Sequence, residues 1–154
     1  MQNPELNREP PPNSFNFGAE LPSTIENVEP VESQFIAALT AAGYDSKNVI
    51  PDLALAFREA LINGMHHGNN FDPGKKVRYA VEVTPQKVKF TVEDQGPGFD
   101  PAQIPDPTAG EGLLKGSGRG ILMMRAYGQV DYNAKGNAVT FEYPKSFEQP
   151  KNKN

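Results

Sequence analysis

Cysteine is absent from this chain of 154 residues, and several other features are scarce. The lack of cysteine excludes disulfide bonds, a thiol nucleophile and any zinc site built on thiolates. Only two histidines are present, and no apolar run approaches the length of about 18 residues that a membrane-spanning helix requires. Residues 1–13 are too polar for a signal peptide. These absences predict a soluble, cytoplasmic protein.

Positive charge is also in short supply. The 15 Lys and Arg residues are outnumbered by 19 Asp and Glu residues, which gives a net charge of −4 and a pI near 5.2. Because no run is rich in Lys and Arg, direct binding of nucleic acid through its phosphates is disfavoured. The length suits one domain, since a chain of about 150 residues can bury roughly 70% of its unfolded surface.

Glycine and proline, in contrast, are abundant. The 14 glycines and 15 prolines make up about 19% of the chain, against an average near 12%. Some of the prolines lie at the two ends, which lack apolar periodicity. We therefore expect a disordered N-terminal extension over residues 1–13, one compact domain over 14–144 and a flexible C-terminal tail over 145–154.

Hydrophobic periodicity divides this domain into strands and helices. Apolar residues at alternate positions predict strands, and apolar residues on one stripe predict helices. Their order favours an α+β fold, a two-layer sandwich of a mostly antiparallel mixed sheet covered on one face by helices. Pro30 is expected in a first turn or at a bend. The expected strands are 15–21, 77–83, 88–92, 129–133 and 138–143, and the expected helices lie within 23–42, 51–66 and 117–127.

Three polar residues are spaced four apart on the second predicted helix: Glu59, Asn63 and His67. At about 100° per residue they stay within about 80° of one another, away from the apolar stripe. A carboxylate one turn from an amide can place a general base beside an oxygen ligand for a hard cation such as Mg²⁺. The alternative is an ordinary polar helix face. Adjacent His66 and His67 do not converge on one ion in a helix, so a histidine metal site is disfavoured.

The expected strands 77–83 and 88–92 are predicted to form a hairpin with one face on the core. Asp94 follows the second of these strands and is an even number of positions from apolar Val92, so both side chains should point to the same face. Its carboxylate should therefore point to the apolar side of the sheet, where burial is costly unless a hydrogen bond compensates. Gly96 and Gly98 come directly after it and let another group approach the backbone closely. Such an acceptor suits an amino group on a planar ligand. The alternative is an aspartate that caps the turn.

A third segment combines glycines with a predicted helix start: Gly116, Ser117, Gly118, Arg119 and Gly120. Glycine is unfavourable in helices by about 1 kcal/mol relative to alanine, so three of them need a reason. Bare backbone N–H groups at a helix N-terminus can surround phosphate oxygens, and the arginine adds charge. The spacing matches neither a P-loop nor a strand-linked G-x-G-x-x-G. A flexible hinge is the alternative.

Together, these segments resemble the boxes of a known ATPase superfamily. The stretch EALINGMHHG resembles the N box, DQGPGF the G1 box and GSGRGILMM the G2 box of the GHKL ATPases, which include gyrase, Hsp90, histidine kinases and MutL. The short N box ending in N-x-x-x-H-G and the compact size look most like the anti-sigma factor branch, the serine-protein kinases of bacterial partner-switching systems. The resemblance covers about residues 15–143 and implies the Bergerat-type ATP-binding fold.

The resemblance implies roles for single residues. In the family, the N box glutamate, here Glu59, acts as the general base in phosphoryl transfer, and the asparagine, here Asn63, binds the Mg²⁺ that bridges the ATP phosphates. The G1 aspartate, here Asp94, accepts a hydrogen bond from the adenine amino group. Gly96 and Gly98 shape that wall of the pocket.

The remaining family features fall on later residues. Residues 116–120 would hold the phosphates, and residues from about 100 to 115 would form the ATP lid. Two departures from the family are visible. Gly64 stands where many relatives carry alanine, and residues 126–133 lack the paired acidic residues associated with members that bind sigma factors.

The function implied by the resemblance is an ATP- and Mg-dependent serine/threonine-protein kinase that acts as an anti-sigma regulatory factor. Its substrate would be a STAS-domain anti-sigma factor antagonist, a sigma factor would be a second partner, and homodimers are common in the family. The alternative is a non-catalytic nucleotide-binding module that sequesters a regulatory protein. The two hypotheses separate on Glu59, which only the kinase needs. A histidine kinase catalytic domain is disfavoured, because the chain has no room for a phosphoacceptor hairpin.

Overall fold

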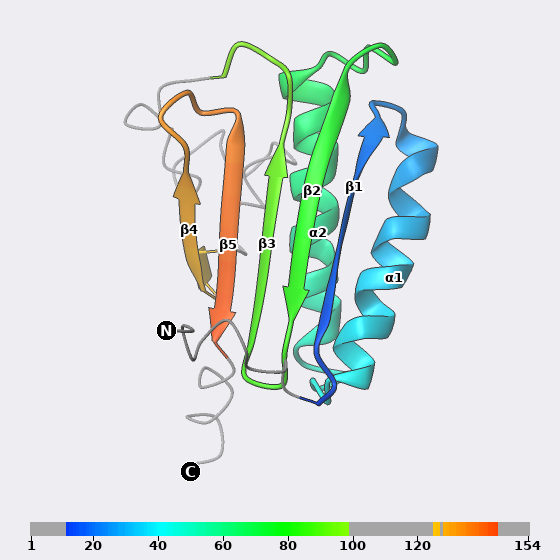
Figure 1. Ribbon diagram of the computed structural model, residues 1–154, viewed down its shortest axis with the longest axis vertical. Coiled ribbons are helices and arrows are strands. Elements are labelled where there is room, and N and C mark those ends of the chain that lie inside the picture. The colour runs from blue at the N-terminus through cyan, green and yellow to red at the C-terminus, as the bar shows by residue number, and fades with distance from the viewer. Residues whose placement is uncertain (1–11, 99–124, 127, 145–154) are drawn as a thin grey trace, which may run out of the picture.

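The sheet forms one layer of the protein (Figure 1). The computed structural model describes residues 12–98, 125–126 and 128–144. Among these residues, five strands lie in the order β1-β2-β3-β5-β4, and every pairing is antiparallel. The predicted strands are confirmed to within one or two residues at each end. The observed bounds are β1 Phe15–Pro22, β2 Lys76–Val83, β3 Lys87–Glu93, β4 Gln129–Tyr132 and β5 Ala138–Pro144.

The predicted hairpin joins β2 and β3 in a register set by alternating side chains. Val81 of β2 lies opposite Phe90 of β3, and both are buried, whereas neighbouring Lys89 is exposed. The Thr84 N–H donates to the Lys87 carbonyl oxygen over 2.8 Å and closes the turn. Because side chains alternate along a strand, this register places the apolar set of both strands on one face.

In the range 12–98, two helical segments cover that face. A short 3₁₀ turn, η1 (Ile25–Asn27), leads into α1 (Val28–Ala41), and α2 (Ile50–Asn63) continues directly into a π-helical turn, η2 (Gly64–Gly68). Pro30 is the third residue of α1, so the first-turn prediction is confirmed. Its missing N–H removes no hydrogen bond there, because the first N–H groups of a helix have no intrahelical acceptor.

The core lies between the helices and the sheet. Four fully buried phenylalanine rings, one from each of α1, α2, β3 and β5, form a continuous cluster in which neighbouring rings are tilted against one another. The ring centroids of Phe35 and Phe57 are 4.7 Å apart, those of Phe57 and Phe90 are 5.1 Å apart, and Phe141 lies 5.1 Å from Phe90. Figure 1 shows α1 and α2 on the same side of the sheet. The predicted α+β two-layer sandwich is therefore confirmed.

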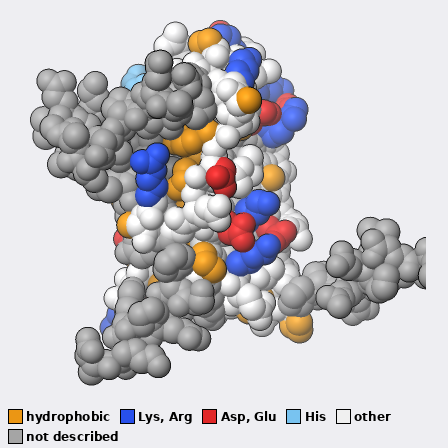
Figure 2. All heavy atoms as spheres, turned by 90° about the vertical axis from the view of Figure 1, so that its left-hand side faces the viewer, with side chains coloured by type: hydrophobic (Ala, Val, Ile, Leu, Met, Phe, Trp, Pro, Cys, Tyr) orange, Lys and Arg blue, Asp and Glu red, His pale blue; other side chains and the backbone are white. Residues whose placement is uncertain are grey.

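The surface carries charges of both signs. Viewed toward the β4 edge, Lys and Arg side chains are interspersed with Asp and Glu side chains (Figure 2). Neither described helix has the length and apolar character needed to cross a bilayer. The expected N-terminal extension falls outside the described residues except for Pro12 and Asn13, and the expected C-terminal tail over 145–154 falls wholly outside them. Of the expected helix over 117–127, only Arg125 and Ala126 are described, and both are helical.

Candidate functional site

Glu59 and Asn63 lie one turn apart at the end of α2. Both side chains are half-buried, whereas the stripe that includes Phe57 and Leu61 is fully buried against the sheet. Asn63 is the last residue of the α-helical part. The helix therefore presents a carboxylate and an amide beside its apolar face, as the spacing predicted.

The turn after Asn63 is wider than an α-helical turn. The Asn69 N–H donates to the carbonyl oxygen of Gly64, five residues back, over 3.0 Å, which is the hydrogen-bond pattern of a π-helix. The prediction that His67 continues the line of Glu59 and Asn63 assumed α-helical geometry through residue 67. That assumption is wrong, because the π turn adds residues to the turn and changes the direction of each later side chain.

The two histidines of this turn are exposed. Their ring centroids are 4.3 Å apart, and His66 also stacks on Phe71 at 5.0 Å. Within residues 12–98, 125–126 and 128–144, no group of three or more His, Cys, Asp or Glu side chains could hold a metal ion.

Asp94 begins the turn after β3 and packs against this same helical turn. A Cβ placed on Gly68 would overlap the Asp94 carboxyl group, and a Cβ placed on Gly64 would lie 3.7 Å from the Asp94 Cβ. The carboxylate thus lies on the helix side of the sheet, as the parity of β3 predicted. The Gly96 N–H donates to Asp94 Oδ1 over 2.8 Å, so the aspartate also caps its own turn. The two readings of Asp94, a turn cap and a ligand acceptor, are compatible.

Burial changes the acidity of this carboxyl group. The pKa of Asp94 is raised above its ordinary value mainly because burial disfavours the charged form, and the neighbouring Glu93 carboxylate adds to the effect. The Gly96 N–H and the Lys135 ammonium act in the opposite direction. A partly desolvated carboxylate with a raised pKa is a candidate functional group.

Glycine lets the backbone segments around Asp94 approach closely. A Cβ on Gly96 would overlap the carbonyl oxygen of Gly68, and a Cβ on Gly98 would overlap that of Lys135. Gly98 also has a φ of +76°, a left-handed conformation that favours glycine. The two glycines of the predicted G1 box are therefore required by contact and by backbone conformation.

Asn69 connects this turn to the start of β2. Its side chain is fully buried, and Nδ2 donates to Ser23 Oγ over 2.9 Å and to the Lys76 carbonyl oxygen over 3.0 Å. Its Oδ1 accepts a hydrogen bond of 2.8 Å from the Gln95 N–H. Both N–H groups and the oxygen of this buried amide are satisfied, which is the condition for burying it without a large penalty.

Asn137 approaches Asp94 from the β4–β5 loop. Its Nδ2 donates to the Asp94 carbonyl oxygen over 2.7 Å, and its own carbonyl oxygen accepts the Asp94 N–H over 2.8 Å. Asn133 holds this loop in shape, because its Nδ2 donates to Asn137 Oδ1 over 2.6 Å and its Oδ1 accepts the Asn137 N–H over 3.0 Å.

Sequence reasoning missed Asn69 and Asn137. A signal existed for Asn69, which directly follows the histidine–glycine end of the N box, and asparagine is favoured where a chain leaves regular structure. Asn137 lies in the short connection between the expected strands 129–133 and 138–143, where no pattern indicates a functional role. Its bond to Asp94 joins residues 43 positions apart, a distance over which periodicity carries no information.

The remaining predicted site residues cannot be placed. Gly116, Ser117, Gly118, Arg119 and Gly120, and the predicted lid over residues 100–115, lie outside the described residues. The structure therefore brings the N box and the start of the G1 box together and does not extend to the G2 box.

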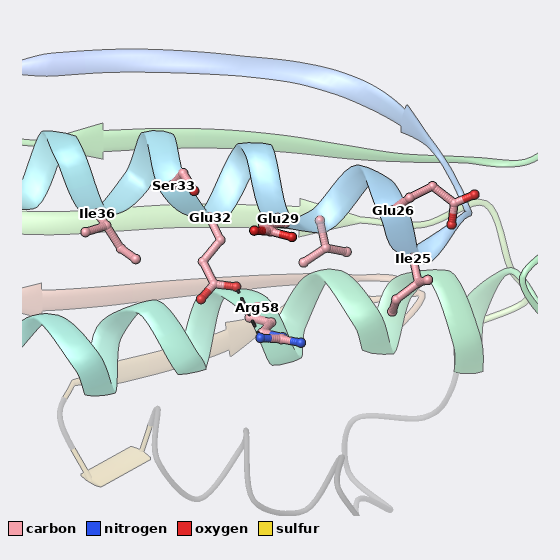
Figure 3. A pocket seen from close by; sticks show the side chains of 8 residues that line it. Ile25, Glu26, Glu29, Glu32, Ser33, Ile36 and Arg58 are labelled. Atoms are coloured by element: carbon pink, nitrogen blue, oxygen red, sulfur yellow. Dashed lines mark ion pairs between the residues drawn. The ribbon is translucent and has the colours of Figure 1, made fainter.

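A separate groove of about 560 Å³ lies between α1 and α2 (Figure 3). Glu32 and Arg58 form an ion pair there, with Oε2 and Nη1 3.7 Å apart. None of the predicted site residues contributes to it. Its lining consists of Ile25, Glu26, Val28, Glu29, Glu32, Ser33, Ile36 and Arg58.

Comparison with known proteins places the chain in a family. No curated protein matches the chain. A family model described as the histidine kinase-like ATPase domain matches residues 21–143, which include the whole of α2, the π turn and the Asp94 turn. Membership of that family fits an ATP-binding role. The chain therefore belongs to the histidine kinase-like ATPase domain family.

Proposed function

We propose that this protein is an ATP- and Mg-dependent serine/threonine-protein kinase that acts as an anti-sigma regulatory factor in a bacterial partner-switching pathway. Its substrate is a STAS-domain anti-sigma factor antagonist, and its second partner is a sigma factor. The observation that carries the proposal is the contact between the Asp94 carboxyl group and Gly68, at the end of the helix that bears Glu59 and Asn63.

The side chains around this contact fit ATP. The Asp94 carboxylate would accept the adenine amino hydrogen, and the absence of side chains on Gly68 and Gly96 lets the Asp94 carboxyl group and the Gly68 backbone pack closely at this position. Asn63 offers the kind of oxygen ligand that Mg²⁺ prefers, and ATP phosphates would supply further oxygen ligands. Bound Mg²⁺ would neutralise charge on the phosphates during transfer.

Glu59 supplies the chemical step in this proposal. Its carboxylate would accept the proton of a serine or threonine hydroxyl as that oxygen attacks the terminal phosphorus and ADP leaves. Its position one turn before Asn63 supports this role, because the base would then lie beside the phosphates that the amide helps to bind. Positioning and charge neutralisation account for most of the catalysis of phosphoryl transfer.

The test uses purified protein, labelled Mg-ATP and the cognate STAS-domain protein. Wild-type protein should phosphorylate the antagonist, and Glu59→Gln should lower the rate by a factor of about 10² to 10⁴, the usual contribution of a general base. Binding of ATP, measured by calorimetry, should change little. Glu82→Gln is the matched control, because Glu82 is also half-buried but lies among the outward-facing residues of β2.

The same assay separates the kinase from a binding module. Wild-type protein that binds ATP and the antagonist without transferring phosphate would contradict the kinase and support the non-catalytic alternative. Loss of ATP binding in Glu59→Gln would instead assign this residue to nucleotide binding.

A further inference from the structure

A single peptide bond in the candidate site is held at both of its polar atoms by side-chain amides. The carbonyl oxygen of Asp94 accepts a hydrogen bond from Asn137 Nδ2 at 2.7 Å, and the N–H of Gln95 donates to Asn69 Oδ1 at 2.8 Å. Both atoms belong to the Asp94–Gln95 peptide bond. Because a peptide unit is planar, fixing its two polar ends fixes the orientation of the whole unit.

The two asparagines are themselves anchored to different parts of the fold. Asn69 is fully buried and bound to Ser23 and Lys76, at the ends of the first two strands. Asn137 is bound to Asn133 within the β4–β5 loop. The peptide bond is therefore held from opposite sides, by the segment after α2 and by the loop between the last two strands.

This arrangement determines where the Asp94 carboxylate points. The Gly96 N–H holds Oδ1 at 2.8 Å, and among the described residues no hydrogen bond is made to Oδ2. The carboxyl group also packs against Gly68, so contacts restrict the backbone and the side chain of Asp94 together. With the peptide fixed, Oδ2 remains an oriented acceptor for an amino group on a ligand.

We propose that Asn69 and Asn137 are positioning residues that orient Asp94 and thereby determine the preference of the site for a 6-aminopurine over a 6-oxopurine nucleotide. The inference rests on the proposed function, since it assumes that Asp94 contacts the base. A 6-oxopurine presents an acceptor where adenine presents a donor, so a correctly oriented carboxylate rejects it. A carboxylate free to turn away discriminates less.

The experiment compares the binding of ATP and inosine triphosphate to the full chain by calorimetry. Wild-type protein should prefer ATP, and Asn137→Ala should reduce the ratio of the two affinities by about fivefold, the effect of losing one neutral hydrogen bond. Asn137 is only half-buried in a loop, so this variant should fold. Val88→Ala is the control, because Val88 is fully buried at the opposite end of β3 from Asp94. It should lower stability and leave the ratio unchanged.

A second measurement tests, without nucleotide, whether Asn69 and Asn137 hold the Asp94–Gln95 peptide bond in place. Amide hydrogen exchange at Gln95, followed by NMR in the free protein, should accelerate in Asn137→Ala and remain at the wild-type rate in Val88→Ala once global stability is taken into account. Accelerated exchange and a reduced ratio together support the proposal.

The outcomes separate this inference from the proposed function. Wild-type protein that binds ATP and inosine triphosphate equally would overturn the assignment of Asp94 to the base and with it this inference, whereas the kinase proposal fails only if the antagonist is not phosphorylated. If the wild type prefers ATP over inosine triphosphate and Asn137→Ala keeps the same ratio of affinities, only the positioning role of the asparagines is overturned. An unchanged exchange rate of the Gln95 amide would also overturn that role, whatever the nucleotide affinities.

Discussion

Gly68→Ala should damage both the fold and the candidate site through a single methyl group. Gly68 is the last residue of the π turn, and its φ is not positive, so the backbone itself would accept alanine. The obstacle is contact: the new Cβ would overlap the Asp94 carboxyl group. The carboxyl group must move away, which breaks its hydrogen bond with the Gly96 N–H.

The size of the effect follows from these contacts. Overpacking of a well-filled region typically costs about 1–3 kcal/mol. Loss of the hydrogen bond between Asp94 and Gly96 adds about 1 kcal/mol to this cost. Alanine offsets about 0.5–1 kcal/mol of it, because an unfolded chain with alanine has less backbone entropy to lose than one with glycine. We therefore expect Gly68→Ala to lower the free energy of unfolding by about 1–3 kcal/mol, which a domain with typical stability of about 5–15 kcal/mol tolerates.

Gly64→Ala is the matched control at the other end of the same turn. Its Cβ would lie 3.3 Å from Val77 Cγ2 and 3.7 Å from the Asp94 Cβ, contacts that a small side-chain adjustment accommodates. The substitution should therefore be neutral or stabilise the fold by up to about 1 kcal/mol.

Urea denaturation of the two variants and the wild type measures both effects, and calorimetry with ATP measures the site. ATP affinity should fall about tenfold or more in Gly68→Ala, the scale of a lost hydrogen bond to a charged group, and remain within about twofold in Gly64→Ala. If Gly68→Ala is as stable as the wild type, or if both variants lose the same free energy of unfolding, the packing of Asp94 on Gly68 is refuted.

Two further predictions concern single groups. Because burial raises the pKa of Asp94, its contribution to stability is complete below the unfolded pKa of about 3.9 and is lost as the pH rises through the folded value. The stability of Asp94→Asn relative to wild type should therefore increase between about pH 3.5 and pH 7, and a constant difference in urea denaturation would contradict it. Tyr44→Phe should cost about 1 kcal/mol, because it removes the 2.7 Å hydrogen bond from the Tyr44 hydroxyl group to the Thr84 carbonyl oxygen, and thermal unfolding that matches the wild type would argue against that bond.

Most of the described fold could be predicted from local patterns. The alternation in β2 and β3 predicted which side chains are buried, and Pro30 lies in the first turn of α1 as expected. The error was the assumption that the second helix stays α-helical as far as His66. Five consecutive residues can form either kind of turn, and hydrophobic periodicity does not distinguish them over so short a stretch.

The sequence by itself determined the order of the elements, the buried face of each strand and the inward parity of Asp94. These features depend on residues a few positions apart, where backbone geometry alone sets the side-chain direction. Only the tertiary structure decided that Asp94 packs on Gly68 and that Asn69 and Asn137 hold the peptide bond after it. These contacts join segments 26 and 43 positions apart, and they depend on how the helix lies on the sheet and how the strands are ordered.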